Sequence, residues 1–297
     1  MNFLKLKAFL LHVLDYVSYK YPRFFLNDKF YIKLRWKFQN PNTYTLNLEV
    51  PETFNEKLNW LKLHDHNSLY SKLVDKYQVK NYVANCIGAE YVVPSYGVYE
   101  SFDDIDFNKL PNQFVLKSTH DSSGAVICVN KKSFDIISAK KHFKKSLSRS
   151  WFWPNREWAY KYVKPRIVVE QYLYDKEKNT LLDYKFWCFN GVPKYMYITN
   201  KSSNITENFY DMDFNPVGIN HGFRRENPEF VKPQNFDNMV NLARQLSAGF
   251  PFVRIDFFYV DKKIYFGEYT FYDWGGLKSF ESYEQDKFLG TLINLSN

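Results

Sequence analysis

Two carboxylates on one predicted β-hairpin constrain this chain more than any other feature. The run VRIDFFYV is followed by Asp261-Lys262-Lys263 and then by IYFGEYT, and both runs are rich in β-branched and aromatic residues typical of strands. If those three residues form the loop, Asp256 faces Glu268 and Arg254 faces Thr270, because side chains alternate along a strand. Like charges in such a pair are unfavourable. The pattern therefore indicates a divalent cation, and magnesium carrying nucleotide phosphates is typical of such oxygen ligands.

The other strand-like runs follow one another closely instead of alternating with helices. They are EYVVPSYGVY, QFVLK and AVICV between residues 90 and 129, and RIVVEQYL, DYKFWCFN and VPKYMYITN between residues 166 and 200. Helical periodicity is found over residues 54–63, 76–87, 134–149 and 236–247. Thr53 with Glu56 forms a capping box before the first helix, and Gly88 ends the second. Clustered strands of this kind predict an α+β fold, not a doubly wound parallel sheet.

Composition limits the class of protein. The chain has 297 residues, of which 45% are hydrophobic, and this is enough for a substantial core. Its net charge of +8 suits nucleic acid, an anionic membrane surface or phosphate-bearing substrates. The RNP, KH and helix-turn-helix signatures are missing, so we expect no nucleic-acid partner. The three cysteines have no CxxC pairing, which indicates a reducing, cytoplasmic compartment and argues against a zinc site or a disulfide framework.

The N-terminal run FLKLKAFLLHVLDYVSY has lysines within its apolar part and no small-residue cleavage site, unlike a signal peptide. It predicts an amphipathic helix, which either packs on the body of the protein or contacts the inner face of a membrane. Aromatic residues make up 20% of the chain. They suit both the stacking of sugar rings and simple core filling, and these two interpretations stay open.

Several further motifs could bind phosphate. Ser118–Gly124 is a small, hydroxyl-rich loop between two predicted strands, and Lys117 immediately precedes it. Such a loop lets backbone N–H groups approach a phosphate, although it does not have the spacing of a Walker motif. Asp183 and Lys185 lie two residues apart on a predicted strand, so that a carboxylate and an ammonium share one face. Each motif alone is also compatible with an ordinary turn or a surface ion pair.

Taken together and in this order, the motifs resemble the ATP-grasp superfamily, and more narrowly its TupA-like branch, named for teichuronopeptide synthesis and met among capsule and O-antigen genes. The runs that carry the resemblance are FNEKLNWLKL, DKYQVKNYV, FVLKSTHDSSG, VVEQYL, DYKFWCFNG, VRIDFFYV and YFGEYTFYDWGG. They extend from about Glu52 to the C-terminus. The resemblance implies an ATP-grasp fold, in which two α+β subdomains clamp a nucleotide.

The same resemblance implies a division of the chain. Residues 1–50 would be a basic N-terminal extension with a helix, and residues 51–110 a helical part that precedes the ATP-grasp domain. The ATP-grasp domain would then span residues 111–297, with subdomains of about 111–172 and 173–297.

The resemblance also implies which residues bind ATP. Lys80 and Lys117 would hold the α- and β-phosphates, and Asp183 the ribose, while Lys185 would reach the γ-phosphate. Two further groups are implied: the flap residues Ser118, Ser122, Ser123 and Gly124, and the adenine hinge residues Glu170, Gln171 and Leu173.

For the metal, the resemblance implies Mg²⁺ on Asp256 and Glu268, with Thr270 where many ATP-grasp enzymes have an asparagine ligand. Arg254 would bind phosphate or acyl-phosphate oxygens, so that Arg254 and Lys185 would be the catalytic cations. The loop from Tyr272 to Gly276 replaces a Gly/Pro-rich loop expected near the acceptor, so the acceptor can differ from those of other ATP-grasp enzymes.

The implied activity is ATP-dependent ligation of a carboxylate to an amine through an acyl phosphate. The capsule context suggests that a uronic acid of a capsular or O-antigen polysaccharide, or of its precursor, is amidated with an amino acid or another amine. Two alternatives remain. A glycosyltransferase would use a sugar nucleotide and could employ the DxD-like Asp211-Met212-Asp213. The other is a saccharide-binding protein without catalysis.

Overall fold

The computed structural model describes Leu10, Val13, Tyr16, Val17, Lys20, Tyr21 and residues 27–122, 124–175, 180–200, 205–226 and 230–295. Most of the predicted N-terminal helix therefore lies outside the described residues, as does Ser123. The α-helices are α2 (Asp28–Gln39), α3 (Phe54–His64), α4 (Leu69–Val74), α5 (Gln78–Ile87), α6 (Ile136–Leu147), α7 (Phe152–Asn155), α8 (Phe236–Ser247) and α9 (Tyr283–Thr291). The strands are β1 (Ser95–Tyr99), β2 (Phe114–Ser118), β3 (Ala125–Cys128), β4 (Ile167–Gln171), β5 (Asp183–Phe189), β6 (Val192–Asn200), β7 (Thr206–Tyr210), β8 (Phe252–Val260) and β9 (Lys263–Thr270).

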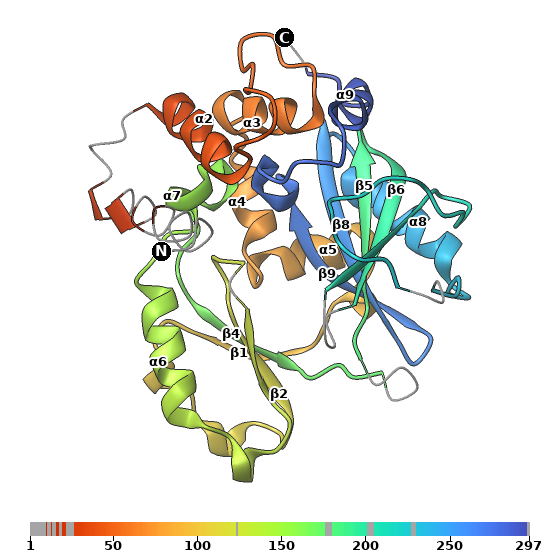
Figure 1. Ribbon diagram of the computed structural model, residues 1–297. Coiled ribbons are helices and arrows are strands. Elements are labelled where there is room, and N and C mark those ends of the chain that lie inside the picture. The colour runs from red at the N-terminus through yellow and green to blue at the C-terminus, as the bar shows by residue number, and fades with distance from the viewer. Residues whose placement is uncertain are drawn as a thin grey trace.

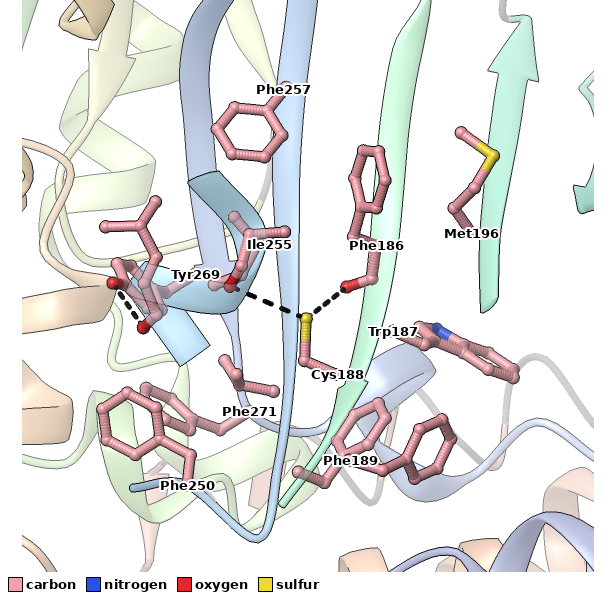
Figure 2. Packing of buried hydrophobic residues seen from close by; sticks show 14 of the residues in the cluster. Phe186, Trp187, Cys188, Phe189, Met196, Phe250, Ile255, Phe257, Tyr269 and Phe271 are labelled. Carbon is pink, nitrogen blue, oxygen red and sulfur yellow. Dashed lines mark hydrogen bonds between the residues drawn. The ribbon is translucent and has the colours of Figure 1, made fainter. Parts of the chain in front are cut away.

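The larger sheet is antiparallel throughout and has the strand order β7-β6-β5-β8-β9 (Figure 1). Its apolar face packs against α8, where the ring of Phe236 lies 5.8 Å from the ring of Phe186. Figure 2 shows Cys188, Ile255 and Phe257 packed together in this core. Because side chains alternate, Lys185 and Asp256 lie on the opposite face, where they are direct cross-strand partners.

The smaller sheet has the order β1-β4-β2-β3, and α6 runs along it (Figure 1). Ala139 and Phe143 of α6 share a separate core cluster with Leu116 of β2 and Ile167 and Val169 of β4. The alternate residues of β2 and β4 therefore face away from α6. Among these, Lys117 and Glu170 point toward the larger sheet, so α6 fixes which polar groups of the small sheet can reach the site.

The helices and two antiparallel sheets confirm the predicted α+β class. The capping box is present, since Thr53 accepts from the Glu56 N–H and Glu56 accepts from the Thr53 N–H. The strand β7 and the helices α2, α4, α7 and α9 were not predicted. Strand β1 precedes the boundary predicted at residue 111, yet it pairs with β4, which follows that boundary. The division into domains stays a prediction.

The hairpin β8–β9 has the predicted pairing, with Arg254 opposite Thr270 and Asp256 opposite Glu268. Its turn, however, is one residue shorter than predicted: Val260 pairs with Lys263, and Asp261 and Lys262 have φ of 51° and 61°. Two consecutive residues with positive φ are typical of a type I′ turn. An irregularity between Asp256 and Phe257 adds one residue on β9 and restores the predicted register at the carboxylates.

The segment 28–48 packs against the C-terminal half of the chain. Ile32, Trp36, Leu46 and Leu48 form a cluster with Leu277, and all five are buried. On the other side of α2, the guanidinium of Arg156 lies 3.9 Å from the centre of the Tyr31 ring. The basic N-terminal extension thus includes a part that belongs to the folded body.

In the described part of the chain, no helix combines the length and the apolar character needed to span a bilayer.

Candidate functional site

The two facing carboxylates of the β8–β9 hairpin are joined by cations. Arg254 donates from Nε to Asp256 Oδ1 at 2.7 Å, and its Nη2 donates to Asp256 Oδ2 at 2.8 Å and to Glu268 Oε1 at 3.0 Å. Lys185 Nζ also donates to Asp256 Oδ2. The repulsion expected between the two acids is therefore compensated by side chains from β8 itself and from the adjacent β5.

The two carboxylates differ in their surroundings. Asp256 is buried, and burial together with the nearby Glu268 raises its pKa above the usual value, against the opposing effect of Arg254 and Lys185. The side chain of Glu268 is 30% exposed. Burial also acts to raise the pKa of Glu268, but Lys76, Arg254 and Lys185 outweigh it and lower that pKa to about 2. Glu268 is therefore an anion throughout the physiological pH range, at the point where the site opens.

The donor set fits a magnesium ion that is also bound by a ligand. Asp256 and Glu268 supply two hard oxygen donors directly opposite each other, and Thr270 lies two residues further along β9. The described residues contain no group of three or more His, Cys, Asp or Glu side chains arranged as metal ligands. Two carboxylates are a common protein contribution to a Mg²⁺ site, where phosphate oxygens and water complete the shell.

Between the two sheets lies a cavity of about 590 Å³, which we call the inter-sheet cavity. Lys117, Asp183, Lys185, Asp256 and Glu268 are among the residues that line it. Its apolar lining includes Leu173, Leu181 and Phe258, which pack together in one small cluster. The cavity can thus accommodate a ligand that has both an apolar part and a charged part.

Glu170 links two of the predicted phosphate-binding lysines. Its Oε1 lies 2.6 Å from Lys80 Nζ, and its Oε2 lies 2.6 Å from Lys117 Nζ. Burial acts to raise the pKa of Glu170, but the two lysines outweigh it and lower that pKa. Of these two lysines, Lys117 lines the inter-sheet cavity and Lys80 does not. Lys80 Nζ also donates to the carbonyl of Val93 at 2.7 Å. Phosphate contact by Lys80 would require its release from Glu170.

The hydroxyl-rich loop is divided between two environments. Ser122 and Gly124 line the inter-sheet cavity. Ser118 is buried beneath α6 and hydrogen-bonds with Ser146 Oγ at 2.6 Å, so it faces away from the cavity. Lys76 donates to the carbonyl of Asp121, and it lines the cavity where Lys80 does not. The sequence predicts Lys76 and Lys80 on one helix face, but this is wrong, because α5 begins at Gln78 and Lys76 lies in the turn before it.

The remaining predicted residues are distributed as follows. Gln171, the last residue of β4, and Leu173, two residues later, line the inter-sheet cavity, whereas Glu170 does not. Asp183 lies beside Lys185, with 3.6 Å between Asp183 Oδ2 and Lys185 Nζ. The roles assigned to these residues stay predictions, since the structure shows their positions and not their ligands.

A second cavity of about 400 Å³ adjoins the first, and we call it the outer cavity. Ser122, Lys185 and Glu268 line both cavities, so the carboxylate pair lies at their junction. Arg254 and Thr270 line the outer cavity. So do Arg35 of α2, Glu207 of β7 and Trp274. Trp274 lies in the loop predicted to be near the acceptor, whereas Arg35 and Glu207 were not predicted from the sequence to be in the site. They come from segments far apart in the chain, and only the fold brings them together.

The DxD-like segment has a structural role. Asp211 follows β7 and accepts hydrogen bonds from the backbone N–H groups of Asp213 at 2.9 Å and Asn215 at 2.8 Å. It closes the turn after that strand, and neither Asp211 nor Asp213 lines the inter-sheet or the outer cavity.

Comparison with known families shows to which family the chain belongs. The model of the TupA-like ATP-grasp family matches residues 56–294. The chain belongs to the TupA-like ATP-grasp family. The matched segment contains both sheets and every residue of the carboxylate site, and it begins after α2. No curated protein matches the sequence significantly.

Solved structures similar to this TupA-like chain include D-alanine–D-alanine ligase from Bacillus anthracis complexed with ATP, at 15% identity and a TM-score of 0.43, over 69% of this chain and 57% of that one. The corresponding ligase from Helicobacter pylori has 11% identity and a TM-score of 0.40, over 75% and 55%. The ATP-grasp ligase PsnB complexed with minimal precursor has 8% identity and a TM-score of 0.40, over 77% and 59%. The chain thus spans somewhat more than half the length of each of these proteins.

Proposed function

We propose that this protein is an ADP-forming carboxylate–amine ligase that uses ATP and forms an acyl phosphate. The observation that carries the proposal is the position of the carboxylate pair. Asp256, Glu268, Lys185 and Arg254 converge where the inter-sheet and outer cavities meet. One cavity could therefore hold the nucleotide and the other the acceptor, with the reacting groups at the junction.

In this proposal ATP lies in the inter-sheet cavity. Leu173, Leu181 and Phe258 would contact the adenine, with Gln171 at the hinge and Asp183 at the ribose. Lys117 and Lys76 line the cavity and would bind phosphate oxygens, while Lys80 acts through Glu170. Of the flap residues, Ser122 and Gly124 are placed to approach the phosphates. Ser118 would support the flap from beneath α6, and Ser123 lies outside the described residues.

The chemistry would follow from charge and alignment. A carboxylate oxygen of the acceptor attacks the γ-phosphorus, and the bond to the β–γ bridging oxygen breaks, which gives an acyl phosphate and ADP. Lys185 and Arg254 would stabilise the charge on the transferred group, because preorganised cations contribute most to phosphoryl transfer. Asp256 and Glu268, with Thr270 beside them, would hold Mg²⁺, which neutralises phosphate charge. A neutral amine then attacks the acyl carbon, the bond from that carbon to the phosphate oxygen breaks, and the leaving phosphate takes up the proton that the nitrogen loses, so that an amide forms.

For the acceptor, we propose a uronic acid of a surface polysaccharide or of its precursor, and for the amine an amino acid. The outer cavity supports this choice, since its lining combines Arg35, Arg254 and Lys185 with Trp151 and Trp274. Cations suit a carboxylate, and indole rings suit the face of a sugar. A cytoplasmic protein that touches the inner membrane face through its N-terminal helix would meet such a precursor.

The test is ADP release in a coupled assay with uronic acids and amino acids in pairs. Asp256→Asn and Glu268→Gln should each lower the rate by about a hundredfold or more, because transition-state charge loses its compensation. Asp213→Asn, at the exposed turn after β7, is the matched control and should leave the rate unchanged. Unfolding temperatures, measured in parallel, exclude misfolding as the cause.

The same assay separates the ligase from the glycosyltransferase. A glycosyltransferase would be stabilised by sugar nucleotides instead of ATP with Mg²⁺, and it would lose activity in Asp213→Asn. That pair of results, or full ADP release in both carboxylate variants, would contradict the proposed ligase.

A further inference from the structure

Glu207 and Thr199, at the wall of the outer cavity, carry buried hydrogen-bonding atoms that nothing in the described chain satisfies. They are direct cross-strand partners on β7 and β6, only 3% and 4% exposed, and both line the outer cavity. Thr199 Oγ1 and Glu207 Oε1 have no hydrogen-bond partner among the described residues. An unpaired buried carboxylate oxygen is costly. The pair therefore indicates a ligand that supplies hydrogen bonds here.

The other oxygen of Glu207 is held in place. His221 Nδ1 lies 3.2 Å from Glu207 Oε2, and the His221 ring packs between the rings of Phe280 at 4.7 Å and Phe209 at 5.5 Å. Both members of the pair are buried. His221 thus holds one oxygen of the carboxylate, and Oε1 is the oxygen left without a hydrogen bond.

Trp274 supplies an apolar surface near this carboxylate. Its side chain is 41% exposed, it lines the outer cavity, and its ring lies 6.4 Å from the His221 ring. Phe223 supports it from one side, with 5.2 Å between ring centres and a near-parallel geometry of 27°. The backbone of Trp274 has φ 48° and ψ 28°, a left-handed conformation that is unfavourable for an aromatic residue. Strain of this kind is commonly retained where it positions a functional side chain.

The chemistry of these groups favours a sugar ring over an ammonium group. Sugar hydroxyls donate and accept, so they can satisfy both a carboxylate oxygen and a threonine hydroxyl, whereas an ammonium group only donates. The apolar face of a sugar can stack on an indole ring. The outer cavity is lined by three cations, Arg35, Lys185 and Arg254, and also by Glu157, Glu207 and Glu268, so its charges balance and the preference for a sugar rests on hydrogen bonding and stacking.

We propose that Glu207, Thr199 and Trp274 bind a saccharide ring of the acceptor in the outer cavity, with Glu207 oriented by His221. The inference deepens the proposed ligase function and rests on it for the identity of the acceptor. It assigns recognition of the ring to the β6–β7 end of the sheet. The carboxylate of the sugar would then point toward Lys185 and Arg254 at the junction of the cavities.

The test measures binding without catalysis, by titration calorimetry or ligand-observed NMR of the full chain. The probes are D-glucuronic and D-galacturonic acid, the neutral sugars glucose and galactose, and the amino acids alanine and lysine. Glu207→Gln keeps the size of the side chain, and Trp274→Asn removes the ring with a residue that tolerates the left-handed conformation. Glu284→Gln, an exposed carboxylate on α9, is the matched control.

We expect the uronic acids to bind the native chain and to bind each of the two site variants about tenfold or more weakly, since a hydrogen bond to a charged group is lost or a stacking surface is removed. Glu284→Gln should bind them normally. Stabilisation by ATP with Mg²⁺ should be unchanged in all three variants. Undiminished uronate binding in Glu207→Gln and Trp274→Asn overturns the inference, as does a loss confined to amino acids, or no sugar binding to the native chain.

The outcome also separates this inference from the ligase proposal. If uronates bind through Glu207 and Trp274 but no ADP is released with any amine, the saccharide site stands and the ligase proposal fails. If ADP release requires Asp256 and Glu268 but the variants at Glu207 and Trp274 keep the native affinity for the acceptor, the ligase proposal stands and the saccharide site is wrong.

Discussion

Arg254 is the residue on which the polar face of the larger sheet depends. Its guanidinium contacts Asp256, Glu268 and Asp273, and its Nη1 donates to Tyr197 OH at 3.1 Å. Burial acts to lower the pKa of Arg254, but Asp256 and its other partners outweigh it and raise that pKa well above the usual value. The planar fork of arginine serves several acceptors at fixed positions, which the point charge of lysine cannot do.

We therefore predict that Arg254→Met lowers the free energy of unfolding by about 3–5 kcal/mol, because it leaves buried carboxylates without a counter-charge. Urea unfolding measures this loss. Arg244→Met, on the exposed side of α8, should change stability by less than about 0.5 kcal/mol. A neutral effect of Arg254→Met would mean that the carboxylates are not held by this residue.

Glu268 gives the site a pH dependence whose sign follows from its lowered pKa of about 2. An acid whose pKa is lower in the folded state than in the unfolded state, where it is about 4.3, stabilises the fold above that unfolded value. This contribution is lost as the pH falls from about 4.3 toward 2, where the folded-state carboxyl takes up a proton.

We predict that wild-type protein loses more stability over this pH interval than Glu268→Gln, so that the difference between their free energies of unfolding shrinks as the pH falls. Urea titrations at a series of pH values measure it. Parallel curves for the two proteins would show that the pKa of Glu268 is not lowered by folding.

At the residue scale, the sequence was informative only where an element imposes a spacing. Asp256 and Glu268 could be paired because strand register relates them directly. Glu207 and His221 could not, because they are joined by an irregular segment and meet only through the packing of His221 among the rings of Phe209, Phe280 and Trp187. No local pattern encodes such a contact. Lys76 was missed for a different reason, since it lies in the turn before α5 and not on the predicted helix face that it was expected to share with Lys80.

At the scale of elements, the β8–β9 hairpin has the predicted carboxylate pairing by a different route from the predicted one. The turn has one residue fewer than the expected loop, and the irregularity at Gly267 adds one residue on β9. The two differences cancel at Asp256 and Glu268. Periodicity predicted the strands, but a two-residue turn of Asp261 and Lys262, both with positive φ, has a weaker sequence signal than the usual Asn-Gly.

The hairpin leaves little space for a side chain at Gly267. A Cβ built there would lie 3.1 Å from the carbonyl oxygen of Asp256 and 3.3 Å from its Cβ. We predict that Gly267→Ala costs about 1–3 kcal/mol of stability, because the obstructing atoms belong largely to backbone. It should also lower ADP release by displacing Asp256.

The matched control is Gly218→Ala, because a Cβ there meets nothing within 4 Å. It should be neutral in both urea unfolding and ADP release. If Gly267→Ala is equally neutral, the bulge does not fix the position of Asp256.

At the scale of the whole molecule, Glu170 links the smaller sheet to helix α5. It belongs to β4 of the smaller sheet, and it pairs both with Lys117 of β2 and with Lys80 of α5. Helix α5 packs in the hydrophobic core of the larger sheet. Two ammonium groups that point into one region would repel each other without this carboxylate. Glu170 thus joins the body that carries α5 to the sheet that covers the inter-sheet cavity.

We predict that Glu170→Gln lowers the free energy of unfolding by about 3 kcal/mol, since it leaves two largely buried cations unpaired. It should also weaken ATP binding, as measured by thermal shift, because Lys117 loses its orientation. Lys140→Gln, which breaks the exposed Lys140–Asp103 pair, should cost less than about 1 kcal/mol. Equal effects of the two substitutions would contradict a joining role for Glu170.

The fold class was predictable at this scale because runs of strands separated by short loops favour antiparallel sheets. The position of α2 was not predictable, since nothing in its sequence specifies that Ile32 and Trp36 pack on Leu277, more than two hundred residues away. That contact depends on the folded C-terminal part of the chain, which positions Leu277.

The attachment of α2 has a consequence for how relatives of this protein could diverge. The ATP-grasp match begins at residue 56, yet Arg35 and Gln39 of α2 form part of the wall of the outer cavity. Asp256, Glu268 and the inter-sheet cavity lie wholly within the matched segment. Exchange or redesign of the first fifty residues would therefore alter the wall of the outer cavity and leave the lining of the inter-sheet cavity unchanged.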